Sequence, residues 1–189
     1  MRLQNNRSGY GLVAIGLHWV MALLILGLFV LGNWMVELDY AHPWYQKAPD
    51  LHRSTGIVVA LLLAIRFAWR LVNPRPVILG ARWERFAAVW VHRILYLLMT
   101  GTVVSGYLIT TADGQGIAVF GWFEIPAYLY GYPHQADVAG EIHESLATFL
   151  ITLAGFHTLA ALKHHFIDRD ETLIRILRVS RSRSPHHTH

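Results

Sequence analysis

The sequence predicts an all-α protein: an integral membrane four-helix bundle with both termini in the cytoplasm. Three observations lead to this fold class. The chain of 189 residues is 54% hydrophobic and 15% charged, and its mean hydropathy of +0.36 is too apolar for an ordinary soluble domain. It contains four apolar runs, each long enough to cross a hydrocarbon core, which requires about 20 helical residues. Its lysines and arginines concentrate on one side of these runs.

The first apolar run spans residues 10–36. It is far longer than the apolar part of a signal peptide, and no small-residue cleavage site follows it, so we expect a spanning helix. In the loop that follows, up to Leu51, Pro43 and Pro49 are expected to interrupt helix. Aromatic residues cluster where an interfacial belt is expected: Trp34, Tyr40, Trp44 and Tyr45.

The second run, residues 52–72, ends at Asn73-Pro74 because proline cannot continue the helical hydrogen-bond ladder. The third run spans residues 86–111. It contains small residues that permit close approach of another helix or of a flat cofactor: Gly101, Ser105 and Gly106. In the connector that follows, the aromatic stretch 120–130 is expected to lie at the membrane interface. The fourth run, residues 140–166, precedes a short arginine-rich segment.

The distribution of basic residues predicts the topology. Only Lys47 and Arg53 of the sixteen lysines and arginines lie with the first and third connectors. By the positive-inside rule, the N-terminus, the second connector and the C-terminus are therefore cytoplasmic. The same distribution explains the pI of 9.6, so we expect lipid and not nucleic acid around the chain. We interpret residues 1–184 as one transmembrane domain and residues 185–189 as a tail, either natural or derived from an expression tag.

Histidine is the one strong metal-ligand residue present in quantity. There are twelve histidines and no cysteines, which excludes disulfides, iron–sulfur clusters and thiolate ligation. His143 and His157 are fourteen residues apart, so on one helix they fall within about 40° of the same face and about 21 Å apart. His18 lies at the predicted depth of His157, and His52 at that of His143. A four-helix bundle would place two such pairs in its core.

Two neutral imidazoles on facing helices, with no soft ligand nearby, suit bis-histidine ligation of haem iron. A proton relay or a transition-metal transporter would also use histidines. Such proteins more often add Asp or Glu at midplane depth, and the four runs hold no acid between their ends. A structural bundle in which the histidines only satisfy one another is the third alternative.

Two more residues bear on the cytoplasmic level. His92, near the start of the third run, can replace His18 or His157 as a ligand, donate to a propionate, or extend to the interface. Arg66 is fourteen residues after His52 and therefore on the same helix face, at the inner level. It is a candidate partner for an inner-haem propionate, the alternative being an interfacial arginine that snorkels.

Four motifs occur in order along the chain: Leu17-His18-Trp19, Leu51-His52-Arg-Ser-Thr-Gly56, Ile142-His143-Glu-Ser-Leu-Ala147 and Phe156-His157-Thr-Leu-Ala-Ala-Leu-Lys-His-His165. As a set, they resemble the bacterial cytochrome b561 family, small four-helix proteins of the inner membrane that bind two b-type haems. The resemblance implies that His18 pairs with His157 and His52 with His143 as haem ligands. It identifies no catalytic residue.

The resemblance implies two functional possibilities. One is a quinone-dependent oxidoreductase of the superoxide oxidase type, which passes an electron from superoxide at the outer face through both haems to ubiquinone. The other is a cytochrome b subunit of a hydrogenase or other dehydrogenase, which has no catalysis of its own and depends on a redox partner protein. In either case, two histidine ligands leave the iron no open position for oxygen chemistry.

The charges of the outer connectors bear on this choice, because superoxide is an anion and a positive entrance would favour it. Lys47 and Arg53 can provide that entrance if they cluster beside the outer haem. At the other end, Lys163 and His164 are candidates to bond a quinone carbonyl, the alternative being interfacial anchoring. Eight acidic residues oppose the two outer cations: Glu37, Asp39, Asp50, Asp113, Glu124, Asp137, Glu141 and Glu144.

Overall fold

Four long helices make up most of the molecule, and all four are long and apolar enough to cross a membrane. The structure, a computed structural model, describes residues 2–179. The helices are α1 (Leu12–Met35), α2 (Lys47–Val72), α3 (Arg82–Thr110), α4 (Gln135–Phe166) and the short α5 (Thr172–Leu177). Between α3 and α4, β1 (Ile117–Val119) and β2 (Phe123–Ile125) form an antiparallel hairpin. The predicted tail, residues 185–189, lies outside the described residues.

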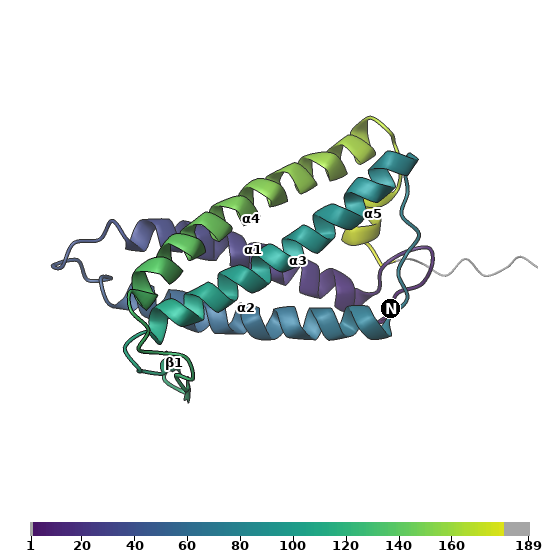
Figure 1. The fold of residues 1–189 in the computed structure, drawn as a ribbon. Coiled ribbons are helices and arrows are strands. Elements are labelled where there is room, and N and C mark those ends of the chain that lie inside the picture. Colours follow the sequence, from purple (N-terminus) through teal and green to yellow (C-terminus); the bar gives the residue numbers. More distant parts are fainter. Residues whose placement is uncertain (1, 180–189) are drawn as a thin grey trace, which may run out of the picture.

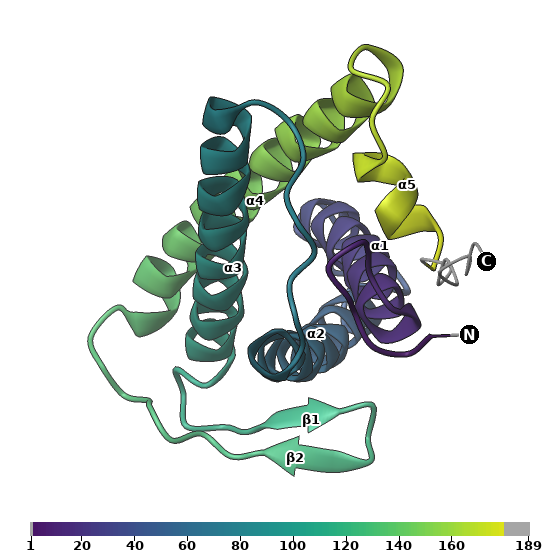
Figure 2. The ribbon, with the colours of Figure 1, turned by 90° about the vertical axis from the view of Figure 1, so that its right-hand side faces the viewer.

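The helices form two neighbouring pairs, α1 with α2 and α3 with α4, that run side by side (Figures 1 and 2). The N-terminal segment, the α2–α3 connector and α5 lie at one end of the bundle, which we call the inner end. The loop 36–46 and the β1–β2 hairpin lie at the opposite, outer end. The positive-inside rule predicts that the inner end is cytoplasmic.

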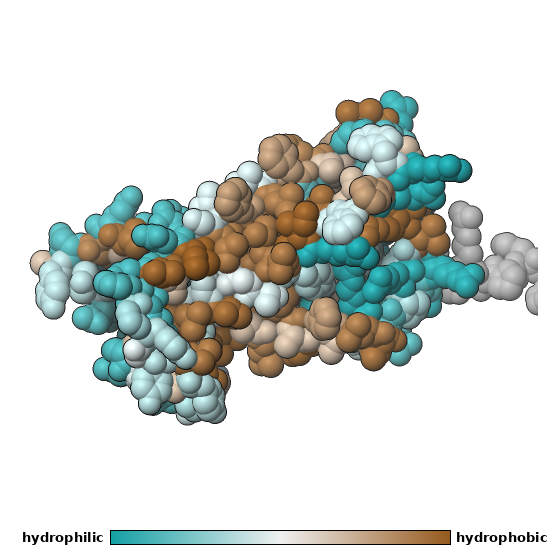
Figure 3. All heavy atoms as spheres, in the orientation of Figure 1, coloured by the Kyte–Doolittle hydropathy of each residue, from teal (hydrophilic) through white to brown (hydrophobic). Residues whose placement is uncertain are grey.

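The surface and core have the pattern of a membrane bundle. Figure 3 shows an apolar band across the middle of the molecule with hydrophilic residues gathered toward the two ends. Each long helix contributes one residue to a buried core cluster: Met21, Leu63, Met99 and Leu150. Leu150 is midway between His143 and His157 along α4, so this core cluster lies between the two histidine levels. The predicted all-α membrane bundle is confirmed.

Three of the four long helices begin earlier than the apolar runs suggested. The second begins at Lys47 and not at His52, and Pro49 lies in its first turn instead of interrupting it. Proline is tolerated there because first-turn N–H groups have no acceptor within the helix. The third begins at Arg82 and not at residue 86. The Glu84 carboxylate stabilises this earlier start by accepting a hydrogen bond of 2.7 Å from the Ala81 N–H.

The fourth helix also begins early, whereas the first begins two residues later than expected. The fourth helix begins at Gln135 and not at residue 140. The Gln135 side chain ties this start to the end of α3, since its Nε2 donates to the Leu108 carbonyl at 2.9 Å. The first helix begins at Leu12 and ends at Met35, inside the expected 10–36, and the third ends at Thr110 and not at residue 111.

The β1–β2 hairpin and α5 were not predicted. The turn between the strands places Phe120 and Gly121 at φ of 50° and 73°, a conformation that Asn-Gly favours in hairpins and that a bulky aromatic residue rarely adopts. Ser54 of α2 holds this turn in place: its buried hydroxyl accepts from the Phe120 N–H at 3.0 Å and donates to the Ala118 carbonyl at 3.3 Å. The aromatic stretch 120–130 is therefore partly a small sheet packed against α2.

Candidate cofactor sites

The outer half of the bundle contains a cavity of about 560 Å³ that all four long helices line. His52 of α2 and His143 of α4 both line it, with ring centroids 6.2 Å apart and ring planes at 68°. A metal ion about 2.0–2.1 Å from one nitrogen of each ring would need centroids roughly 6 Å apart. The two imidazoles therefore fit the requirement for holding one metal ion between them.

Glycines give these imidazoles and a flat group the space they need. A Cβ atom at Gly32 of α1 would lie 3.2 Å from His52 Cε1, and one at Gly106 of α3 would lie 3.0 Å from His143 Cε1. A side chain at either position would push a ring out of place. Gly56 also lines the cavity, and a Cβ atom there would meet nothing within 4 Å. The cavity thus has both fixed imidazoles and open space beside them.

The hydrogen bonds of His143 determine which of its two ring nitrogens is free to bind a metal. Its Nδ1 lies 2.9 Å from the Thr102 carbonyl and 3.3 Å from the Ser105 hydroxyl. A carbonyl only accepts, so Nδ1 carries the proton and Nε2 stays free for a metal, which is the usual arrangement of a ligating histidine. The Nδ1 of His52 is buried without a hydrogen-bond partner among the described residues.

The inner level holds three imidazoles. His92 of α3 and His157 of α4 are in edge contact, with centroids 5.0 Å apart, and His18 of α1 lies within electrostatic range of both. The Nδ1 of His92 donates to the Ala88 carbonyl at 2.6 Å, which leaves its Nε2 free. Ligation by His18 with His157 stays a prediction, and His92 lies close enough to His157 to compete with His18.

Arg66 reaches this inner level, as its spacing from His52 predicted. Its Nη2 donates to His18 Nδ1 at 3.0 Å and its Nε donates to the Tyr96 hydroxyl at 3.1 Å. A guanidinium only donates, so a neutral His18 that accepts this bond carries its own proton on Nε2. His18 can therefore ligate a metal through Nε2 only when Arg66 turns away from it.

The two outer cations do not cluster. Arg53 lines the cavity, but its guanidinium forms an ion pair with Asp50. Asp113 also lines the cavity, whereas Lys47, the first residue of α2, is not among the residues that line it. The cavity entrance thus offers one cation, already paired, and one carboxylate, which gives little attraction for an anion.

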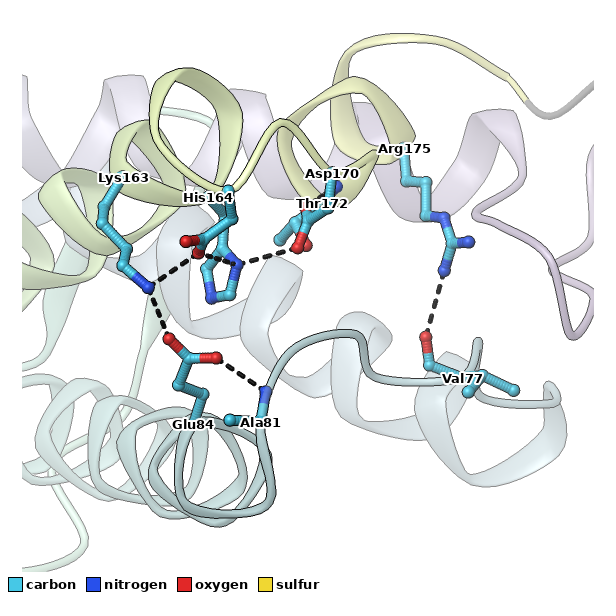
Figure 4. Close-up of polar contacts among 9 residues, drawn as sticks. Val77, Ala81, Glu84, Lys163, His164, Asp170, Thr172 and Arg175 are labelled. Carbon is cyan, nitrogen blue, oxygen red and sulfur yellow. Dashed lines mark hydrogen bonds and ion pairs between the residues drawn. The ribbon is translucent and has the colours of Figure 1, made fainter.

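Lys163 and His164 belong to an ionic cluster that joins α3, α4 and the segment before α5 (Figure 4). Lys163 Nζ lies 2.5 Å from Glu84 Oε1 and 2.7 Å from Asp168 Oδ2. His164 Nδ1 lies 3.1 Å from Asp168 Oδ2 and 2.8 Å from Asp170 Oδ2. Both side chains are engaged with carboxylates, and a role for either in binding a quinone stays a prediction.

Asp170 is held in its charged form within this cluster. Burial by itself would raise the pKa of its carboxyl, but hydrogen bonds from Thr172 and from His164 lower it below the usual value of 3.8. The Thr172 N–H donates to Asp170 Oδ1 at 2.7 Å, which also fixes the first turn of α5. The cluster is therefore built around ionised carboxylates.

Three groups that contact the imidazoles or Arg66 were missed in the sequence. The Thr102 carbonyl has no sequence signal, because every residue offers a carbonyl. Gly32 is one of fifteen glycines, and its close approach to His52 depends on how α1 and α2 pack. Tyr96 was open to prediction: it follows His92 by four residues on α3 and so shares its face.

The fold and these sites define a class of protein: a membrane-embedded helical bundle whose core is suited to an imidazole-ligated cofactor. A family model described as prokaryotic cytochrome b561 matches residues 9–178. The chain is 46% identical over 184 residues to cytochrome b561 homolog 2 of Escherichia coli (strain K12), covering 96% of this chain and 98% of that one. The chain belongs to the prokaryotic cytochrome b561 family.

Two more distant relatives have different names. The chain is 28% identical over 175 residues to the probable superoxide oxidase CybB of Yersinia pestis, covering 89% of this chain and 95% of that one. It is 29% identical over 178 residues to cytochrome b562 of Cereibacter sphaeroides, covering 92% and 98%. The protein is therefore a multi-pass bacterial membrane cytochrome that binds b-type haem and transfers electrons.

Proposed function

We propose that the protein carries electrons through two b-type haems to ubiquinone in the bacterial inner membrane. His52 and His143 hold one haem, and His18 and His157 hold the other. The observation that carries this proposal is the outer cavity of about 560 Å³ with two imidazoles whose centroids are 6.2 Å apart. The inner haem is supported by three further imidazoles at the opposite level and by the arginine beside them.

Haem supplies reversible one-electron chemistry when it is bound. The residues of the chain bind it, orient it and keep water away. The Thr102 carbonyl fixes the ring of His143, and Gly106 gives that ring its place. The core cluster of Met21, Leu63, Met99 and Leu150 fills the bundle between the two levels with apolar side chains, which keeps this region at low dielectric.

We propose superoxide as the small donor at the outer end, on the strength of the relative named a probable superoxide oxidase. The second candidate function is an electron-transfer subunit that receives electrons from a docked redox protein. Arg53 favours this second function, because the one cation that lines the cavity is already paired with Asp50. The two functions share the haems and differ only in the donor.

A single assay on the purified protein separates the two. Superoxide is generated enzymatically beside the protein and a soluble ubiquinone, and haem reduction and quinol formation are followed together. Quinol formation that His52→Ala abolishes supports the superoxide function. Haem reduction that occurs only after a co-purified dehydrogenase and its substrate are added supports the subunit function. A purified protein without a b-type haem spectrum contradicts both.

A further inference from the structure

Two arginines of α2 lie in the inner half of the bundle without a negative partner. Arg66 and Arg70 are one helical turn apart and partly buried. Within the described part of the chain, the hydrogen bonds of Arg66 all go to neutral groups, and both guanidinium groups lie over the ring of Tyr96, at 5.9 Å and 5.2 Å from its centroid. Among residues 2–179, neither arginine forms an ion pair.

A third cation, Arg175, and the neutral hydroxyl of Tyr10 lie near these two arginines, toward the inner end. Tyr10 lies two residues before the start of α1, and burial raises the pKa of its hydroxyl against the opposing influence of Arg70, Arg66 and Arg175 nearby. Arg175 of α5 has a side chain only 18% exposed, and its Nε is buried without a partner among the described residues. Its one carboxylate contact, at 3.5 Å, is to Glu171, which is 71% exposed.

Backbone contacts close the chain around these side chains. Arg175 Nη1 donates to the Val77 carbonyl at 3.1 Å, and the Val77 N–H donates to the Arg7 carbonyl at 3.0 Å. The N-terminal segment, the α2–α3 connector and α5 are thereby held together at the inner end, around the ends of α1 and α2 (Figure 2). Within this frame, the Arg175 guanidinium is held by its bond to the Val77 carbonyl.

Like charges held together in a partly buried place repel one another, and a charge in a spanning segment is costly without a partner. Guanidinium groups and tyrosine hydroxyls offer many donors here, and the one carboxylate that contacts them among the described residues is the exposed Glu171, at 3.5 Å from Arg175. An oxyanion supplies both the negative charge and the hydrogen-bond acceptors that this group of residues lacks. Its charge balances the cations, and its paired oxygens match the fork of a guanidinium.

We propose that Arg66, Arg70 and Arg175, with the hydroxyls of Tyr10 and Tyr96, form a binding site for an oxyanion, either a carboxylate or a phosphate. Two sources share this chemistry. One is the carboxylates of an inner haem, which rests on the proposed function. The other is the phosphate of an anionic phospholipid of the inner leaflet, which basic pockets between spanning helices are known to bind.

The test compares Arg70→Gln and Tyr10→Phe with a matched control, Arg93→Gln. Arg93 is an exposed arginine of α3 that also stacks on an aromatic ring, that of Trp90 at 5.0 Å. The holoprotein of each variant is titrated by spectroelectrochemistry. Binding of phosphatidylglycerol, with phosphatidylcholine as the neutral reference, is measured in mixed micelles.

Loss of a cation beside haem carboxylates stabilises the oxidised haem. If the carboxylate is the ligand, Arg70→Gln lowers the reduction equilibrium constant of one haem about tenfold, which is about 59 mV for one electron, and leaves lipid binding unchanged. If the phosphate is the ligand, Arg70→Gln abolishes the preference for phosphatidylglycerol and leaves both potentials unchanged. Tyr10→Phe keeps all charges and removes only a hydroxyl donor. It should therefore change whichever measurement Arg70→Gln changes, the haem potential or the lipid preference, but by a smaller amount.

Arg70→Lys keeps the charge but loses the fork. It should recover most of the potential if the carboxylate is the ligand, and only part of the preference for phosphatidylglycerol if the phosphate is the ligand. Variants of Arg70 that match Arg93→Gln in both measurements overturn the proposal. A wild-type protein that contains a single haem contradicts the inner haem of the proposed function. In that case, the lipid measurement decides the oxyanion site by itself.

Discussion

At the scale of single residues, the outer site depends on how closely the imidazoles pack against glycine. Gly106→Val would place side-chain atoms at the edge of His143, because its Cβ atom alone would lie only 3.0 Å from Cε1. We expect this change to displace the ring and weaken haem binding roughly 10–100-fold, as loss of a ligand-orienting contact does. Titration of the haem-depleted protein with haem, followed by absorbance, measures the effect.

Gly155→Ala is the control for this prediction, because a Cβ atom at Gly155 of α4 meets nothing within 4 Å. It should bind haem like the wild type. Equal affinities of Gly106→Val and Gly155→Ala would show that the ring of His143 has no fixed place and would contradict the assignment of the outer site.

The residue scale also shows what helical periodicity can and cannot predict. The spacing along α4 predicts that His143 and His157 share a face, and the same rule brings Arg66 to the inner level. Periodicity along one helix says nothing about the rotation of its neighbour. The contact of His92 with His157 and the hydrogen bond of Arg66 to His18 depend on that rotation, so neither could be predicted.

At the scale of elements, the β1–β2 hairpin depends on one hydroxyl of α2. Ser54→Ala removes the acceptor of the Phe120 N–H and the donor to the Ala118 carbonyl. Leaving a fully buried N–H group unpaired costs about 1–3 kcal/mol, and the partly buried Phe120 N–H should cost less. We expect this cost to appear locally as faster amide exchange in residues 117–125. Thr158→Ala, which removes an exposed hydrogen bond within α4, should leave amide exchange in residues 117–125 unchanged.

The ionic cluster at the inner end makes the stability of α5 depend on pH. Because the folded-state pKa of Asp170 lies below its usual 3.8, its contribution is fully present above that value and is lost as the pH falls through the folded-state pKa. Wild-type protein should therefore lose more thermal stability than Asp170→Asn between pH 5 and pH 3. Melting curves of both proteins in one detergent test this, and identical losses would contradict it.

Some features of the helices and strands could be predicted from the sequence and others could not. The four spans were predictable because about 20 apolar residues in a row have few alternatives to a membrane helix. Their starts were not, because Pro49 is tolerated in a first turn and Glu84 extends α3 by accepting from the Ala81 N–H. The hairpin has strands of three residues, and its turn has Phe120 where Asn or Asp is usual, so Gly121 alone was too weak a signal to predict it.

At the scale of the whole molecule, the distribution of basic residues predicts the orientation. The chain has no cysteine, so single cysteines report the side of the membrane directly. In intact spheroplasts, an impermeant maleimide should label Tyr40→Cys, in the exposed outer loop, and should label Arg75→Cys, in the α2–α3 connector, only after lysis. The reverse pattern would place the inner end outside the cytoplasm.

The haem content of the whole molecule is tested by changing each histidine of the two levels to alanine in turn. We expect His52→Ala and His143→Ala to remove the same haem signal from a redox titration, and His18→Ala and His157→Ala to remove the other. His92 is the decisive comparison. Its Nε2 is free and its ring touches His157, whereas His18 accepts a bond from Arg66 that ligation would have to break.

If an anion withdraws Arg66 from His18, as the oxyanion site implies, His18 becomes free to ligate through Nε2, and His92→Ala keeps both haems. If Arg66 stays on His18, the free nitrogen of His92 makes it the better inner ligand. His92→Ala then loses the inner haem and His18→Ala keeps it. Arg66→Gln separates these cases further, because it releases His18 in both but weakens inner-haem binding only where Arg66 bonds the haem carboxylates.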